Sequence, residues 1–214
     1  MTILILTFLI IVLAVMLIQA EYRQQRQRVY FFKPLTTVCI ILMAWFIPNP
    51  VSAIYRSLIL LGLVFSLAGD IFLMLPSDRF VAGLRSFLMA HVCYLAAFSI
   101  GSRLSYSYVS LLPLIIYGSV IFWMLFPRLD VPLRIPVAVY MLALLAMCWM
   151  AWNRWLSVEH SGSLLAFTGA LFFVASDSLL AIDRFKVRFR KARFYVLTTY
   201  FTAQWLIAFS ITSA

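Results

Sequence analysis

The sequence has few charged residues, and acidic residues are the rarest of them. Only 11% of its 214 residues are charged, with 7 Asp and Glu against 17 Lys and Arg, whereas soluble domains average about 25% charged residues. Hydrophobic residues make up 65% of the chain, and the mean hydropathy is +1.03. This composition excludes an ordinary water-soluble domain and predicts a single integral membrane domain over residues 1–214.

The signatures of several enzyme classes are also missing. The chain has no GxSxG nucleophile elbow, no HExxH, no GxGxxG and no phosphate-binding loop. Its three cysteines, Cys39, Cys93 and Cys148, form no CxxC pair and lie in apolar segments, so we expect free core thiols. Nothing in the spacing of the remaining side chains demands a metal. We therefore expect no cofactor, and acid–base chemistry without a covalent nucleophile remains.

Eight apolar runs separated by short loops predict eight transmembrane helices and an all-α, polytopic helix bundle. The loops are too short to hold a soluble domain. We expect the first run to be a retained helix because it lacks a signal-peptide pattern. Lys33-Pro34 is expected to open the second helix, with Pro34 in its first turn. The predicted ranges are 2–20, 32–47, 57–75, 85–100, 108–126, 133–153, 162–182 and 194–212.

Basic residues are concentrated in alternate loops. One set of loops contains only Arg56, Arg103 and Arg154. By the positive-inside rule, the other set lies in the cytoplasm and both termini lie outside. These charges flank apolar helices, so they indicate topology and not binding to nucleic acid. The other set holds Arg23, Arg26, Arg28, Lys33, Arg79, Arg85, Arg128, Arg134, Arg184, Lys186, Arg188, Arg190, Lys191 and Arg193.

Two acidic residues, Asp70 and Asp177, lie inside apolar runs. An aspartate at the middle of a membrane helix costs about 2.5–3.5 kcal/mol, so it indicates a functional site by default. Each follows a glycine by eight positions, Gly62 and Gly169, and the two 14-residue segments share five identities. Because both aspartates fall on the third helix of a set of four, this match suggests a 4+4 internal repeat, with chance similarity as the alternative.

Several polar side chains are expected in one layer beneath the basic loops. Asp70 lies six residues before Pro76, Asp177 six before Asp183 and His91 six after Arg85, so each lies at a depth of about 9 Å. Tyr200 lies in the same layer, and Tyr94 and Gln204 lie one helical turn further in. We predict Asp70 and Asp177 as catalytic residues. The predicted supporting or substrate-binding residues are His91, Tyr94, Tyr200, Gln204, Lys33, Ser66 and Ser176.

Each of these residues also has a structural interpretation. The aspartates, Tyr94, Tyr200 and Gln204 could serve only as hydrogen-bonding groups between helices. His91 could be a core histidine with satisfied hydrogen bonds, and Lys33 could be only a topology charge.

The chain contains Phe32-Lys-Pro-Leu-Thr36, Ser66-Leu-Ala-Gly-Asp70, His91-x-x-Tyr94, Gly169-Ala-x-x-Phe-x-x-Ser-Asp177 and Tyr200-x-x-Ala-Gln204. Together these motifs resemble the YhhN family of eight-span membrane proteins, which includes lysoplasmalogenases. The resemblance implies hydrolysis of the vinyl-ether bond of lysoplasmalogens to a fatty aldehyde and a glycerophospho-alcohol, with the two motif aspartates as catalytic residues. It also implies a lysophospholipid substrate and a bacterial inner-membrane location.

Vinyl-ether hydrolysis needs one acid and one base. The acid protonates the β-carbon, and water then captures the resulting oxocarbenium ion, as in glycoside hydrolysis. Two carboxyl groups in a dry layer suit these roles because their environments can differ. We assign Asp177 as the acid and Asp70 as the base, with Lys33 or a loop arginine binding the lipid phosphate. Two other functions stay open: a proton-coupled transporter of small molecules or lipids, and a lipid-binding or structural protein.

Overall fold

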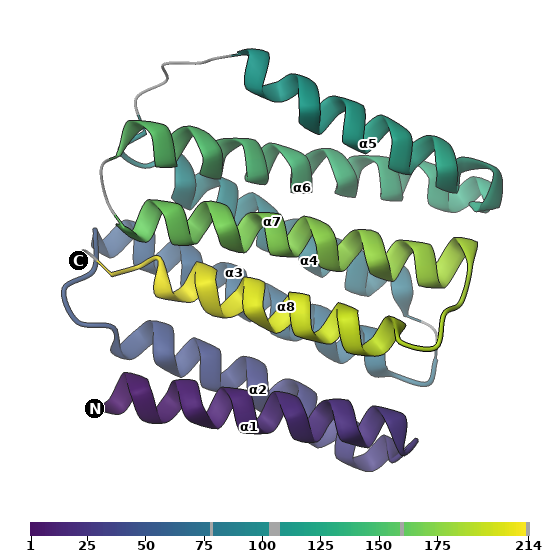
Figure 1. The fold of residues 1–214 in the computed structure, drawn as a ribbon, viewed down its shortest axis with the longest axis horizontal. Helices are drawn as coiled ribbons and strands as arrows, with labels where there is room; N and C mark the ends of the chain where they lie inside the picture. Colours follow the sequence, from purple (N-terminus) through teal and green to yellow (C-terminus); the bar gives the residue numbers. More distant parts are fainter. Residues whose placement is uncertain (78, 103–107, 159–160, 213–214) are drawn as a thin grey trace.

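The computed structural model is a bundle of long helices that run back and forth along one direction (Figure 1). It describes residues 1–77, 79–102, 108–158 and 161–212, so Arg103 lies outside the described residues. Within them, the α-helices are α1 (Thr2–Tyr22), α2 (Arg26–Phe46), α3 (Ala53–Met74), α4 (Phe80–Ser99), α5 (Leu111–Leu125), α6 (Val131–Ser157), α7 (Ser161–Ala181) and α8 (Ala192–Phe209). Shorter helical turns are η1 (Tyr108–Ser110), η2 (Phe126–Arg128) and η3 (Ile182–Lys186).

The prediction of an all-α membrane bundle is confirmed. Among the described residues, 7 helical segments are long and apolar enough to cross a membrane, namely α1 to α4, α5 with η2, α6, and α7 with η3. α8 is not in this set because polar residues such as Tyr200 and Gln204 lower its hydropathy. It nevertheless runs alongside α7 and packs against α2 in the same bundle (Figure 1). The chain is therefore a multi-pass membrane protein.

The polarity of the bundle is inverted relative to a soluble protein. Large apolar side chains face outward, with Trp123 79% exposed and Ile135 75% exposed, whereas Asp70, His91 and Gln204 are buried. Hydrocarbon offers no hydrogen bonds, so polar groups inside the membrane must find partners within the protein. The interior of the bundle is therefore the place where a polar site forms.

The expected start of the second helix is wrong. α2 begins at Arg26, so Pro34 lies inside the helix and not in its first turn. The residues ahead of the apolar run include Arg and Gln, which are good helix formers, and they extend the helix toward the N-terminus. The hydroxyl of Thr36, two residues beyond the proline, donates to the carbonyl of Phe32 at 2.8 Å. The helix therefore continues through the proline, which removes only one backbone donor.

The two motif glycines allow close packing of helices. A Cβ atom at Gly62 would lie 2.3 Å from the ring of Tyr94 on α4. At Gly169 it would lie 2.8 Å from Cγ1 of Ile207 and 3.1 Å from the carbonyl oxygen of Ala203, both on α8. Small residues at such contacts are typical of membrane helix pairs. The glycines thus bring α3 onto α4 and α7 onto α8, while the internal repeat stays a hypothesis.

We expect Gly169→Ala to destabilise the bundle more than Gly118→Ala. The new methyl group at position 169 meets the backbone of α8, and overpacking of this kind costs about 1–3 kcal/mol. At position 118 the nearest atom is the mobile Cδ1 of Leu145, at 2.5 Å. The intrinsic helix preference gained is the same in both variants, so it cancels. Thermal unfolding in detergent measures the difference, and equal midpoints for the two variants would contradict this account of the α7–α8 contact.

Candidate active site

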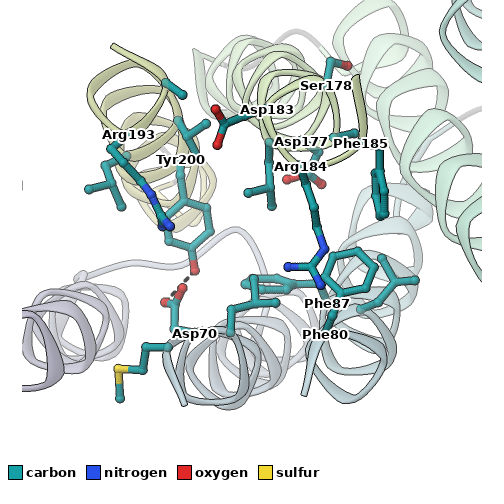
Figure 2. A pocket seen from close by; sticks show the side chains of 18 of the residues that line it. Asp70, Phe80, Phe87, Asp177, Ser178, Asp183, Arg184, Phe185, Arg193 and Tyr200 are labelled. Atoms are coloured by element: carbon teal, nitrogen blue, oxygen red, sulfur yellow. Dashed lines mark hydrogen bonds between the residues drawn. The ribbon is translucent and has the colours of Figure 1, made fainter. Parts of the chain in front are cut away.

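A cavity of about 710 Å³ opens at the end of the bundle where α1, α3, α5 and α7 finish. We call this the basic end, because 14 of the 17 Lys and Arg residues lie there. The cavity wall includes Lys33, Asp70, Asp177 and Tyr200. Figure 2 shows that Asp70 and Asp177 reach the cavity from different helices, α3 and α7. The structure thus brings both predicted aspartates to one cavity.

Asp70 is held by three donors from two other helices. Its Oδ1 atom lies 3.2 Å from Nζ of Lys33 on α2. Its Oδ2 atom accepts hydrogen bonds from Thr37 at 2.8 Å and from the phenol of Tyr200 on α8 at 2.7 Å (Figure 2). The Asp70 side chain is only 1% exposed. A cation and two hydroxyls therefore stabilise a buried negative charge at this position.

A chain of polar groups continues behind Tyr200. Gln204 donates from Nε2 to the Tyr200 oxygen at 3.2 Å, and Tyr94 donates to Oε1 of Gln204 at 2.8 Å. Ser66 lies 3.4 Å from the Tyr94 oxygen. All four side chains are buried. This chain fixes the Tyr200 phenol, and through it the orientation of the Asp70 carboxylate.

Asp177 has a different set of partners. Tyr140 on α6 donates a very short hydrogen bond to Oδ2 of Asp177. Nε2 of His91 on α4 lies 2.9 Å from the Tyr140 oxygen and 3.5 Å from the same carboxylate oxygen. The other carboxylate oxygen, Oδ1, has no hydrogen-bond partner among the described residues, and the side chain is 14% exposed. Asp177 therefore presents one oxygen toward the cavity.

The Nδ1 atom of His91 is buried and has no hydrogen-bond partner among the described residues. A buried N–H group without a partner is costly, so the proton of the ring belongs on Nε2, where it is donated to Tyr140. The phenol of Tyr140 then donates to Asp177. Neither partner brings a lysine or arginine to Asp177, and this is the main electrostatic difference from Asp70.

An aromatic wall packs between the two carboxyl clusters. The ring of Phe173 lies 5.6 Å from that of Tyr200 and 4.7 Å from that of His91. Phe87 contacts both Tyr200 and Phe173, at 5.9 and 6.4 Å between ring centroids, and also lines the cavity. These rings keep the tyrosine and histidine partners in place and exclude water from the region between the two clusters.

The structure separates the predicted supporting residues into three groups. Lys33 and Tyr200 line the cavity beside the aspartates. His91, Tyr94, Gln204 and Ser66 lie behind them in the two hydrogen-bonded clusters. Ser176 is not part of either cluster. Its hydroxyl donates to the carbonyl of Val196 at 3.2 Å and is buried in the contact between α7 and α8.

Two partners of the aspartates were missed by the sequence analysis. Thr37 lies one helical turn after Lys33, and no pattern in the sequence singled it out. Tyr140 stands in an apolar run and carried no motif. One signal was present: Lys33 and Tyr140 are separated by the same 107 positions that separate Asp70 from Asp177. Comparing the two halves position by position would have identified Tyr140 as the counterpart of Lys33.

The mouth of the cavity contains several charged side chains. The guanidinium of Arg184 lies 4.1 Å from the ring centroid of Phe80, and both residues border the cavity (Figure 2). Arg193 lies 3.9 Å from a carboxylate oxygen of Glu21. Arginines stacked on aromatic rings are well placed to bind anionic groups. The cavity therefore has a positively charged entrance above its two carboxyl groups.

Groups suited to a metal ion are absent from the part of the chain that the structure describes. No cluster of three or more His, Cys, Asp or Glu side chains has the required arrangement there. Cys39, Cys93 and Cys148 are free and buried. The polar groups that line the cavity are carboxyl, phenol, hydroxyl, amide, guanidinium and ammonium groups.

Comparison with known proteins gives consistent matches. The sequence model described as "YhhN family" matches residues 27–211. The "Uncharacterized membrane protein YhhN" of Escherichia coli O157:H7 is 29% identical over 194 residues, covering 91% of this chain and 92% of that protein. "Lysoplasmalogenase TMEM86A" of Bos taurus is 35% identical over 71% of this chain and 64% of its own length. "Lysoplasmalogenase TMEM86B" of Homo sapiens is 34% identical, covering 83% and 73%. No solved structure matches the chain.

We expect Lys33→Met to destabilise the protein strongly, because it leaves the Asp70 carboxylate buried without its cation. Breaking a buried ion pair by removing one partner costs about 3–5 kcal/mol. The double variant with Asp70→Asn removes the orphaned charge and should recover most of this loss. Unfolding of the two single variants and the double variant in detergent gives the coupling energy. Additive effects would contradict the pairing of Lys33 with Asp70.

Proposed function

The chain belongs to the YhhN family, and we propose that it is a lysoplasmalogenase that hydrolyses the vinyl-ether bond of single-chain alkenyl phospholipids. Lysoplasmalogenases among its relatives support a hydrolase. The observation that carries the proposal is the pair of carboxyl groups with unequal partners on one membrane-embedded cavity. Vinyl-ether cleavage requires this combination, because one group must supply a proton while another stabilises positive charge.

The partners of the two aspartates support different roles. Asp70 is paired with the ammonium of Lys33, so it is the fixed anion and the base. Asp177 has the phenol of Tyr140 and the imidazole of His91 as partners, and its Oδ1 atom has no hydrogen-bond partner among the described residues. It is therefore the acid, with Tyr140 and His91 orienting its carboxyl group. Pairs of carboxyl groups in contrasting environments divide acid and base work in this way.

The reaction begins with proton transfer from Asp177 to the β-carbon of the vinyl ether. The double bond supplies the electron pair, and the positive charge that develops on the ether oxygen and its α-carbon is stabilised by Asp70. Water then adds to the α-carbon and gives a proton to Asp70. The product of this stage is a hemiacetal, and both aspartates have exchanged their protonation states.

Collapse of the hemiacetal restores both groups. Asp177 takes the proton from the new hydroxyl as the carbonyl forms, and Asp70 returns its proton to the departing glycerol oxygen. One water molecule is consumed, and the products are a fatty aldehyde and a glycerophospho-alcohol. Each carboxyl group regains its starting protonation state, while the proton first given by Asp177 stays on the former β-carbon. The cycle therefore needs neither a metal nor a covalent intermediate.

The order of the chemical groups along the cavity matches a lysophospholipid in a bilayer. Arg184 and Arg193 stand at the entrance, where a lipid phosphate would lie. Asp70 and Asp177 follow at the depth of the bond next to the glycerol. The cavity then continues along apolar side chains of α5, α6 and α7. The positive-inside rule places this basic end on the cytoplasmic side of the membrane.

We expect purified protein to release aldehyde from lysoplasmenyl-ethanolamine, and Asp70→Asn and Asp177→Asn each to reduce the rate by a hundredfold or more. This is roughly the contribution of a positioned acid or base, about 10²–10⁴. The amide keeps the shape of the side chain while removing its acidity. Asp130→Asn is the matched control, because Asp130 is exposed at the start of α6 and does not border the cavity.

A wild-type protein that releases no aldehyde would refute the proposed activity, as would two aspartate variants that retain the wild-type rate. Proton flux into liposomes then becomes the measurement for the transporter alternative. In that case the two carboxyl groups would act as a proton relay.

A further inference from the structure

The cavity has an apolar arm that the acid–base chemistry does not use. Beyond Asp177 its walls come from α5, α6 and α7. On α6 the arm extends from Tyr140 to Leu145, about 7 Å further from the basic end at 1.5 Å per residue. The arm therefore runs in the same direction as the lipid chains of the surrounding bilayer. Deeper than Tyr140 its apolar wall residues are Met141, Leu144, Leu145 and Val174, whereas Ile121, Leu125 and Val137 line the part of the cavity nearer the basic end.

The arm reaches the outer surface of the bundle between α5 and α7. Tyr117 of α5 and Ser178 of α7 both line the cavity, yet the Tyr117 side chain is 38% exposed. Ser178 lies two helical turns from Leu171, which is 43% exposed, so both are on the outward face of α7. Figure 2 shows Ser178 on the side of α7 that points away from Asp70. A cavity residue that is also exposed marks the place where the cavity meets the lipid.

Among the described residues, one hydrogen bond joins α5 to α7 across this gap. The hydroxyl of Tyr117 donates to Ser178 Oγ at 2.7 Å, and Ser178 itself donates to the carbonyl of Val174 at 2.7 Å. In hydrocarbon neither hydroxyl can use water as a partner, so the bond joins two helices at a lipid-facing position. α5 lies at the edge of the bundle and packs mainly on α6 (Figure 1). Breaking this bond therefore frees the α5–α7 gap without disrupting the core.

We propose that the hydrocarbon chain of a single-chain lipid enters sideways through this gap and lies in the apolar arm. The inference rests on the proposed function, since it names the chain subsite of the same cavity. Three features identify the occupant. The apolar arm runs along the membrane normal, the two carboxyl groups lie at the end of the arm nearer the basic end of the bundle, and the arginines lie between those carboxyl groups and the cytoplasmic surface. Together they match an amphiphile with an anionic head and one tail. Lateral entry also spares the chain from passing through water at the basic end.

Photolabelling tests the subsite independently of hydrolysis. The probe is an ester-linked lysophosphatidylethanolamine with a diazirine in the part of its hydrocarbon chain next to the ester group, added to the full-length protein in phosphatidylcholine vesicles. We expect labels on the arm residues of α5, α6 and α7, located by peptide mass spectrometry. Val174→Trp fills the arm and should reduce this labelling about tenfold, the loss expected from excluding about two methylene groups. Leu171→Trp, on the lipid-facing side of the same helix, should leave it unchanged.

Two further variants separate the arm from its entrance. Leu145→Phe narrows the arm from α6, so the test holds if Val174→Trp does not fold. Tyr117→Phe keeps the ring but removes the bond to Ser178, and it should speed labelling about fivefold, the value of one hydrogen bond. Tyr195→Phe, an exposed tyrosine of α8 outside the cavity, is its control. An unchanged labelling rate in Tyr117→Phe would overturn the proposed entrance.

The possible outcomes distinguish the chain subsite from the catalytic proposal. Labels confined to outward-facing residues, or insensitive to Val174→Trp and Leu145→Phe, would overturn the subsite even if the protein releases aldehyde. Labels in the arm that both variants suppress would support it even if the protein releases none. Where aldehyde is released, Val174→Trp should raise KM about tenfold for long alkenyl chains and leave short chains unaffected, because only long chains fill the arm.

Discussion

The structure depends on one constraint: a carboxylate buried in hydrocarbon needs a counter-charge and hydrogen-bond donors from within the protein. Asp70 obtains them from Lys33 and Thr37 of α2 and from Tyr200 of α8. Two consecutive helices, α2 and α3, and the distant helix α8 therefore meet at the two carboxylate oxygens of Asp70. The same contact fixes the position of α8, the helix with too many polar residues to qualify as an apolar span. A polar network thus defines both the core and the site.

The second carboxyl group is held in a related way with a different charge. Asp70 takes partners from α2 and α8, and Asp177 takes partners from α6 and α4, so each aspartate is contacted by the preceding helix of its own half and by the last helix of the other half. This crossed arrangement supports the hypothesis of a 4+4 repeat. The important departure is the replacement of Lys33 by Tyr140 at the corresponding position. It removes a cation from beside the second carboxyl group, and the proposed role of Asp177 as the acid rests on this difference.

The residues of the site that could be predicted from the sequence are the charged ones. A charged side chain in a membrane helix costs free energy, so it stands out in an apolar run. Asp70, Asp177 and Lys33 stand out as charges in or beside apolar runs, and the structure brings all three to one cavity. Tyr140 was missed because tyrosines are common in membrane helices, and only its hydrogen bond to Asp177 shows that it belongs to the site. Ser176 was included because it adjoins Asp177, although neighbouring residues on a helix face different directions. The start of α2 was misjudged because helices extend beyond the apolar run that reveals them.

The most direct test of the central claim is to follow isotopes through the reaction with an alkenyl lysophospholipid. The account predicts that, in H₂¹⁸O, the new oxygen appears in the fatty aldehyde, and that in D₂O one deuterium appears on the carbon next to the aldehyde group. The glycerophospho-alcohol should contain no ¹⁸O. Label in the glycerol fragment, or an aldehyde without carbon-bound deuterium, would contradict protonation of the vinyl ether by a cavity carboxyl group followed by capture of water.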